Sequence, residues 1–241
     1  MRLALFIPCF VEHLHPEVGL ATARLLDRLE LDWIYPEAQT CCGQPAFNAG
    51  HPGECLDAAR HFLSKFRDFD TVVAPSGSCV AMVRRYSSLD GFSHKEGQEF
   101  EELAARIFEL SDFLVNQLQV VDVGASFKIR GTIQDSCHTL RELGISDEPR
   151  QLLNAVRGLE LVDQAGLDCC GFGGVYSVKM PELSILQADD RLEAAMQARC
   201  ESIIGTEPSC LMHLQARADH RKLPIRTLHL AELLAGENDE G

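Results

Sequence analysis

The feature that most constrains this chain is a pattern of cysteines that occurs twice. Each set contains a single cysteine, an adjacent pair followed by glycine, and a distal cysteine: Cys9, Cys41-Cys42-Gly43 and Cys79, then Cys137, Cys169-Cys170-Gly171 and Cys210. The single cysteine and the pair are 32 positions apart in both sets, and the second set is displaced by 128 residues for these marks and by 131 for the distal cysteine. A repeat of this length determines the architecture before any other feature is considered. It predicts two similar halves, each of which gathers four thiols.

Short apolar runs alternate along the chain with stretches of helical spacing. Six runs read as strands, three in each half: residues 3–8, 32–36, 71–74, 130–133, 159–162 and 202–205. Residues 99–118 read as one long helix, because four apolar residues recur at helical spacing: Leu103, Ile107, Leu110 and Leu114. Strands that alternate with helices predict α/β units around parallel strands. We therefore expect an α/β fold of two pseudo-symmetric repeats, residues 1–122 and 123–241, each with a small, mostly parallel sheet flanked by helices.

Composition limits the class of protein. A hydrophobic content of 46% over 241 residues is enough for ordinary globular cores. The net charge of −14 argues against a nucleic-acid partner and against an anionic membrane surface, since both attract basic proteins. No apolar run approaches the roughly 20 residues that span a bilayer, and the first run is too short for an export signal. We therefore expect a cytoplasmic protein without a membrane span, in which the cysteines stay reduced and serve as metal ligands or redox groups.

In each half, the single cysteine, the cysteine pair and the distal cysteine, here called the three marks, each follow an apolar run. This placement predicts where the thiols meet. In parallel α/β sheets, ligands gather beyond the carboxyl ends of the strands, so neighbouring loops can bring four sulfurs to one point. Four thiolates suit an iron–sulfur cluster or a structural zinc ion, but zinc sites usually contain C-x₂-C pairs and this chain has none. Glycine after each pair, Gly43 and Gly171, lets the backbone approach an inorganic core and donate N–H groups to its sulfides. The sequence therefore favours an iron–sulfur cofactor over zinc, with eight metal ligands: Cys9, Cys41, Cys42, Cys79, Cys137, Cys169, Cys170 and Cys210.

Five motifs of the chain resemble the cysteine-rich CCG domain of iron–sulfur oxidoreductases. That family includes the heterodisulfide reductase B subunit and the glycolate oxidase iron–sulfur subunit, and the motifs lie at residues 36–48, 75–79, 135–138, 169–174 and 228–232. The resemblance covers nearly the whole chain and is strongest to members that serve lactate utilisation. It implies an iron–sulfur subunit, with one or two [4Fe–4S] clusters, of a cytoplasmic system that oxidises L-lactate to pyruvate. It also implies two partner proteins, one of them with ferredoxin-like clusters.

The chain departs from the heterodisulfide reductase pattern at one position in each half. That subunit has C-x-x-C at the third mark, whereas Ser76 and Glu207 stand here in place of the first cysteine. A non-cubane cluster with five cysteines is therefore not expected, while four ligands suffice for a [4Fe–4S] cluster. In the second half, Gly173 adds a cofactor-binding position to those of the two paired-cysteine glycines, and this half is expected to be the more open to a substrate or partner.

Oxidation of a hydroxy acid also requires a group that takes a proton. His138, which follows a ligand cysteine, and Glu207, which replaces one, are the candidates for this catalytic role. The plainer interpretations are a capping or surface histidine and a turn residue at a strand end. The two cysteines outside the repeat, Cys55 and Cys200, are expected to be core residues.

Three functions are compatible with the sequence. The leading hypothesis is an iron–sulfur electron-transfer subunit of a lactate-oxidising system. The second is a redox subunit that uses thiol–disulfide chemistry of the heterodisulfide reductase type. The third is a structural metal-binding scaffold of the same complex without redox activity. Iron, sulfide and zinc contents distinguish the first hypothesis from the third.

Overall fold

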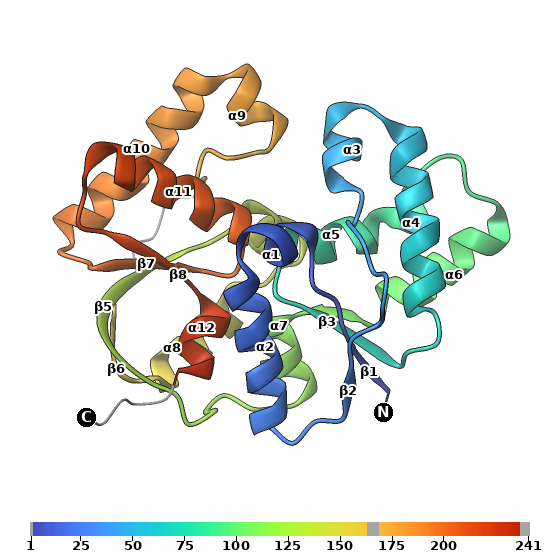
Figure 1. Ribbon diagram of the computed structural model, residues 1–241, viewed down its shortest axis with the longest axis horizontal. Coiled ribbons are helices and arrows are strands. Elements are labelled where there is room, and N and C mark those ends of the chain that lie inside the picture. The colour runs from blue at the N-terminus through green and yellow to red at the C-terminus, as the bar shows by residue number, and fades with distance from the viewer. Residues whose placement is uncertain (1, 163–168, 237–241) are drawn as a thin grey trace.

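The computed structural model describes residues 2–162 and 169–236, and within them the chain forms two four-stranded parallel sheets (Figure 1). The first sheet has the order β2-β1-β3-β4 and the second the order β6-β5-β7-β8. The strands are β1 (Leu3–Leu5), β2 (Trp33–Ile34), β3 (Thr71–Ala74), β4 (Ile107–Glu109), β5 (Ser126–Gln134), β6 (Arg157–Leu161), β7 (Ser202–Gly205) and β8 (Arg226–His229). The predicted α/β fold of two similar repeats is confirmed, because both halves have the same strand order and every pairing is parallel.

Helices connect the parallel strands and cover the faces of the sheets. In the first half they are α1 (Cys9–Leu14), α2 (Pro16–Arg28), α3 (Gln44–Ala49), α4 (Pro52–Phe66), α5 (Gly77–Arg85), a 3₁₀ turn (Tyr86–Ser88), α6 (His94–Ala104), α7 (Leu110–Asp112) and a π-helical turn (Phe113–Gln117). In the second half they are a π-helical turn (His138–Glu142), α8 (Asp147–Ala155), α9 (Val175–Lys179), α10 (Pro181–Gln197), α11 (Pro208–Arg221) and α12 (Leu230–Ala235). Proline occupies the first position of α2, α4, α10 and α11, where its missing N–H leaves no intrahelical bond unmade. No helix in the described ranges is long and apolar enough to cross a bilayer.

The predicted long helix over residues 99–118 is wrong. The capping box of Ser93 and Glu96 begins α6 at His94, and the helix ends at Ala104. The chain then adds β4 beside β3, with Ile107 opposite Val72. Of the apolar residues that suggested one helix, Leu103 lies in α6 and Ile107 in β4. Leu110 and Leu114 lie in the turns after the strand, so the helical spacing across all four is a coincidence. The corresponding edge strand of the second half, β8, was likewise not predicted.

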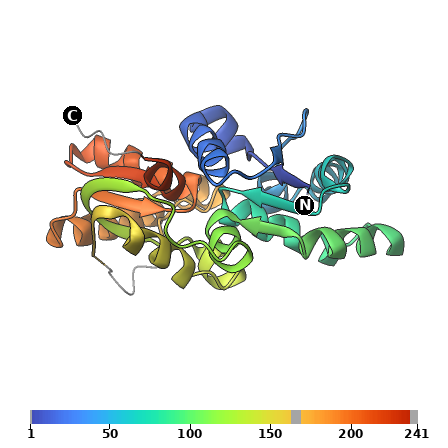
Figure 2. The same ribbon diagram turned by 90° about the horizontal axis from the view of Figure 1, so that it is seen from below.

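The last helical segment of each half packs against the other half. Helix α12 contacts α2 of the first half, where the Arg28 guanidinium donates hydrogen bonds to the Leu234 and Ala235 carbonyl oxygens at 2.9 and 2.7 Å. Reciprocally, α7 and the π-helical turn after it contact α8, and Asn116 donates a 2.9 Å hydrogen bond to Glu148. Figure 2 shows the red C-terminal segment beside the blue N-terminal helices.

The exchanged helices create a core that both halves share. One buried apolar cluster includes Leu25 and Phe113 from the first half together with Leu152 and Leu233 from the second. The predicted boundary between residues 122 and 123 separates the two sheets, but this cluster crosses it. The division into domains at that position stays a prediction.

Candidate functional site

All eight repeated cysteines line one cavity of about 290 Å³. Cys9 begins α1 shortly after β1, and Cys137 follows β5 in the same way. Cys79 and Cys210 lie in the first turns of α5 and α11, which follow β3 and β7. The structure therefore brings together every cysteine predicted to be a ligand, at the carboxyl ends of the strands, where parallel α/β sheets place ligands.

In the first half, the four thiols form two close pairs. The Sγ atoms of Cys9 and Cys41 are 3.5 Å apart, and those of Cys42 and Cys79 are 3.4 Å apart. The pKa of Cys41 is lowered to about 3, because Cys42 and Cys9 donate hydrogen bonds to its sulfur and the Gly43 N–H reaches it at 3.4 Å. The pKa of Cys9 is raised, first by its bond to Cys41 and then by burial. Cys41 is therefore the group of this set that favours the thiolate, which is the form that binds metals and acts as a nucleophile.

In the second half, one thiol pair is close, and the pKa values of all four thiols are raised. The Sγ atoms of Cys170 and Cys210 are 2.7 Å apart, and the backbone N–H groups of Gly171 and Phe172 point at the Sγ atoms of Cys169 and Cys170 at 3.4 and 3.5 Å. The pKa of Cys169 is raised by its contact with Cys170 and by burial. The two sets therefore differ in charge preference although their layout is the same.

The backbone conformation explains why a glycine follows each cysteine pair. Gly43 and Gly171 have φ of 80° and 86°, in the left-handed region that other residues rarely adopt. A Cβ at Gly171 would also lie 2.2 Å from the Ser184 carbonyl oxygen of α10. This conformation directs both N–H groups at sulfur. Gly173, with φ of 50°, lines the cavity as well. The cofactor-binding role of the three glycines stays a prediction.

The donor set fits a thiolate-bound inorganic group. No three described Cys, His, Asp or Glu side chains converge around a single point as a ready-made site for one metal ion, because the thiols lie in pairs. The cavity nevertheless offers eight thiols, and the first turns of α5 and α11 bring the positive ends of their dipoles to it. Such surroundings stabilise an anionic cluster or a metal thiolate.

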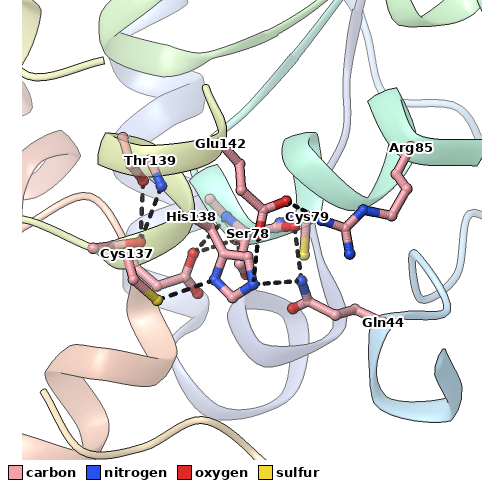
Figure 3. A network of polar contacts seen from close by, with 11 residues as sticks. Gln44, Ser78, Cys79, Arg85, Cys137, His138, Thr139 and Glu142 are labelled. Carbon is pink, nitrogen blue, oxygen red and sulfur yellow. Dashed lines mark hydrogen bonds and ion pairs between the residues drawn. The ribbon is translucent and has the colours of Figure 1, made fainter. Parts of the chain in front are cut away.

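His138 lies at the junction of the two halves (Figure 3). Its Nδ1 is 3.6 Å from Cys137 Sγ, while its Nε2 is 3.3 Å from Gln44 Nε2 and 3.5 Å from Glu142 Oε1. Glu142 also accepts a 2.6 Å hydrogen bond from Arg85. The imidazole therefore connects a cavity thiol to a partly exposed carboxylate, which makes a proton-transfer role geometrically feasible.

Glu207 is buried, with 4% of its surface exposed, and it also lines the cavity. Its Oε2 accepts hydrogen bonds from Ser76 Oγ at 3.0 Å and from the Ser78 N–H at 2.9 Å, and its Oε1 accepts one from Ser209 Oγ at 3.0 Å. Both carboxylate oxygens are thus occupied by donors from the cysteine loops. The catalytic roles predicted for His138 and Glu207 stay predictions.

Several residues that hold the cysteine turns were not predicted. Tyr86 donates a 2.7 Å hydrogen bond to the Cys42 carbonyl oxygen. Ser184 donates a 2.7 Å hydrogen bond to the Gly171 carbonyl oxygen. Tyr86 is 44 residues from Cys42 in the sequence and Ser184 is 13 residues from Gly171, so no local signal identifies them. Aromatic residues that directly follow marks carried such a signal: the rings of Phe10 and Phe172 meet edge to face at 5.7 Å across the two halves.

Comparison with known proteins agrees with this geometry. The family model of the cysteine-rich domain named CCG matches the chain twice, at residues 3–84 and 131–215. Lactate utilization protein A of Geobacillus kaustophilus is 42% identical over 239 residues, covering 99% of this chain and 100% of that protein. The protein of the same name from Bacillus subtilis is 39% identical over 235 residues, covering 97% and 99%.

Similarity to solved structures is remote. Glutamate racemase from Francisella tularensis aligns with 97% of this chain and 77% of its own, at 10% identity and a TM-score of 0.37, which is too low to carry an argument. The two family-model matches together span more than half of the chain, and each contains one complete cysteine set. The chain therefore belongs to the cysteine-rich CCG domain family.

Proposed function

We propose that this chain is the iron–sulfur electron-transfer subunit of a cytoplasmic system that oxidises L-lactate to pyruvate. The observation that carries the proposal is the single cavity lined by all eight repeated cysteines. Similarity over the full length to proteins named Lactate utilization protein A supports the role in lactate utilisation. The repeated thiol set supports the iron–sulfur cofactor.

Oxidation of L-lactate to pyruvate releases two electrons and two protons, so the system needs acceptors for both. When bound, an iron–sulfur group supplies one-electron transfer. The cysteine thiolates would hold the group, and the N–H groups of Gly43 and Gly171, directed at sulfur, would help to set its reduction potential. The contact between Phe10 and Phe172 provides an apolar wall that limits water around the thiols.

In this proposal, His138 or Glu207 takes up a proton that lactate oxidation releases. His138 is the better placed of the two, because its ring contacts a cavity thiol on one side and Glu142, which is 34% exposed, on the other. Glu207 accepts three hydrogen bonds from neighbouring serines and is buried. Its geometry suits a fixed carboxylate better than a mobile proton carrier.

The partners in this proposal are two proteins of the same lactate-oxidising system, one with ferredoxin-like clusters. The cavity is lined in part by Gln44 of α3 and Val175 of α9. These two helices stand on either side of the upper gap in Figure 1. A partner that docks across α3 and α9 would bring its own redox group close to the cysteines.

Anaerobic purification followed by iron, sulfide and zinc analysis tests the proposal. The four repeated cysteines of each half are called a quartet, the first being Cys9, Cys41, Cys42 and Cys79. If both quartets hold a [4Fe–4S] cluster, each chain contains about eight iron and eight sulfide, and one loaded quartet gives about four of each. Cys55→Ser is the matched control, since Cys55 is buried in an apolar cluster but is not one of the residues that line the cavity. A colourless protein with stoichiometric zinc and no sulfide would refute the electron-transfer role and support a structural scaffold.

A thiol–disulfide redox subunit is the second candidate, and the close thiol pairs favour it. Cys170 and Cys210 are already within 2.7 Å, and Cys41 favours the thiolate that attacks disulfides. This candidate predicts that a disulfide substrate takes up the two electrons and two protons that lactate oxidation releases. It also predicts that a low-molecular-weight thiol changes the visible spectrum of the loaded protein. Iron–sulfur loading without any thiol-dependent change would exclude it.

A further inference from the structure

The two halves touch through one pair of equivalent residues beside the cysteines. Ser76 lies three positions before Cys79, and Glu207 lies three positions before Cys210. Ser76 Oγ donates a hydrogen bond to Glu207 Oε2 at 3.0 Å. Because the two positions correspond in the repeat, this hydrogen bond joins equivalent points of the two halves. They are also the positions at which a further cysteine is replaced.

Glu207 acts on the first turns of two helices at once. It is the N-cap residue of α11, which carries Cys210, but its side chain makes no cap bond in that helix. The carboxylate instead reaches the other half, where Oε2 accepts the Ser78 N–H at 2.9 Å in the first turn of α5. An anion at this end of a helix is stabilised by the exposed N–H groups and by the helix dipole. Ser76 is the N-cap residue of α5, and the second half supplies a further acceptor at this helix start, where Cys79 lies.

A continuous hydrogen-bonded path joins this carboxylate to a cysteine of the first quartet. The Cys79 N–H donates to Ser76 Oγ at 3.4 Å, and the Ser76 hydroxyl donates in turn to Glu207. Ser76 is 2% exposed and Ser78 is 6% exposed, so water does not readily replace these bonds. Removing the carboxylate leaves buried donors without an acceptor, which is the costly way to break a hydrogen bond.

The same carboxylate also contacts the cysteine turn of the second half. Its Oε1 accepts a 3.0 Å hydrogen bond from the hydroxyl of Ser209, the residue directly before Cys210. One side chain thus contacts the cysteine turns of both halves.

We propose that Glu207 is a positioning residue that ties the two thiol sites together, by holding the first-half turn that presents Cys79 to the cavity. The hydrogen bonds of Glu207 are a property of this chain alone, whereas the expected effect of Glu207 on metal content rests on the proposed function. Glu207→Gln keeps an oxygen that accepts from Ser76 and Ser78, and Glu207→Ala keeps none. Glu207→Gln therefore removes the carboxylate charge and keeps the hydrogen-bonded link, whereas Glu207→Ala removes both.

The first test uses the full-length, metal-free, reduced protein and measures alkylation of each cysteine by N-ethylmaleimide with mass spectrometry. In Glu207→Ala, the Cys79 rate is expected to rise on the order of tenfold over the parent chain. In Glu207→Gln the rise stays within about twofold to threefold, and the Cys55 rate stays constant in both variants. An unchanged Cys79 rate in Glu207→Ala overturns the proposal. If that variant unfolds, so that Cys55 reacts too, Ser76→Ala decides by the same Cys79 criterion.

The second test assigns the effect to the first quartet in the iron-loaded protein. Cys170→Ser removes one thiol of the second quartet, so the iron that is left belongs to the first. Adding Glu207→Ala to this background is expected to lower the remaining iron at least threefold, whereas Glu207→Gln and the exposed control Glu182→Ala retain it. Equal iron in all four chains overturns the link. If the parent chain binds no iron, the proposed function fails, while the alkylation test still decides the role of Glu207.

Discussion

Glu109 offers a quantitative test of the fold, because this buried carboxyl group has no cationic partner among the described residues. It is the N-cap residue of α7, and it is 0% exposed. Oε2 accepts hydrogen bonds from the Ser111 N–H at 2.7 Å and from the Ser111 hydroxyl, while Oε1 is buried with no partner among the described residues. Burial raises its pKa from 4.5 to about 7, against these bonds, which act to lower it. The perturbation is Glu109→Gln, which removes the ionisable group and keeps its shape.

The sign of the effect follows from the two pKa values. Below pH 4.5 the carboxyl is neutral in both states and contributes no penalty. Between pH 4.5 and about 7 the unfolded chain ionises while the folded chain stays neutral, so stability falls as pH rises. The difference of about 2.5 units corresponds to about 3 kcal/mol in total, of which about 2 kcal/mol falls between pH 5.5 and 8.5.

The pH-dependent contribution of Glu109 to the unfolding free energy is measured by urea unfolding of the parent chain and of Glu109→Gln at several pH values between 5.5 and 8.5. The variant is expected to gain about 2 kcal/mol relative to the parent over this range, because every other group titrates alike in both proteins. The intrinsic effect of the amide cancels, since only the change with pH is compared. Glu96→Gln is the control: the Arg60 guanidinium holds the pKa of that carboxyl at about 2, so its titration lies below the range. Parallel stability curves for the parent and Glu109→Gln would refute the reasoning.

Three further predictions concern the site and its supports. Cys42→Ser is expected to lose the metal of the first quartet, whereas Cys55→Ser leaves metal content unchanged; loss of metal only from Cys55→Ser would contradict the assignment of ligands. Gly171→Ala, at φ of 86° and against the α10 backbone, is expected to lose about 3 kcal/mol of unfolding free energy in urea, while Gly53→Ala on α4 stays near the parent value. Burial lowers the pKa of His229 from 6.5 to about 4, so its contribution is present above pH 6.5 and is lost as pH falls through 4. In His229→Gln, the loss of unfolding free energy between pH 6.5 and pH 4 should therefore be smaller than in the parent chain by about 3 kcal/mol. An equal loss in both chains would exclude this histidine as its source.

The sequence predicts the meeting of the thiols because strand ends and cysteine spacing are both local patterns. Each mark follows a run that becomes a strand, as Cys79 follows β3 and Cys210 follows β7. Parallel strands place their carboxyl ends at one edge, so the repeat and the strand pattern together suffice to bring four thiols of each half near one another. That argument needs no knowledge of long-range packing.

The sequence does not predict what depends on tertiary contacts, either within one half or between the two halves. β4 spans only three residues, and its Ile107 shares helical spacing with the residues around it, so pairing with β3 decides the outcome. The union of the eight cysteines in one cavity, and the bond between Ser76 and Glu207, require the relative position of two repeats. No periodicity within either repeat encodes that position.

The exchanged terminal helices explain how that position is fixed. If each half closed its own core, the two cysteine sets would be joined only by a linker and by surface contacts, and their separation would vary. Here α12 packs on α2 and the α7 region packs on α8, so the apolar core is shared by both halves. Any relative rotation of the sheets would have to open buried apolar contacts, which costs far more than bending a linker. A cavity whose walls come from both repeats can therefore keep a constant shape, and a carboxylate such as Glu207 can serve a helix of the opposite repeat.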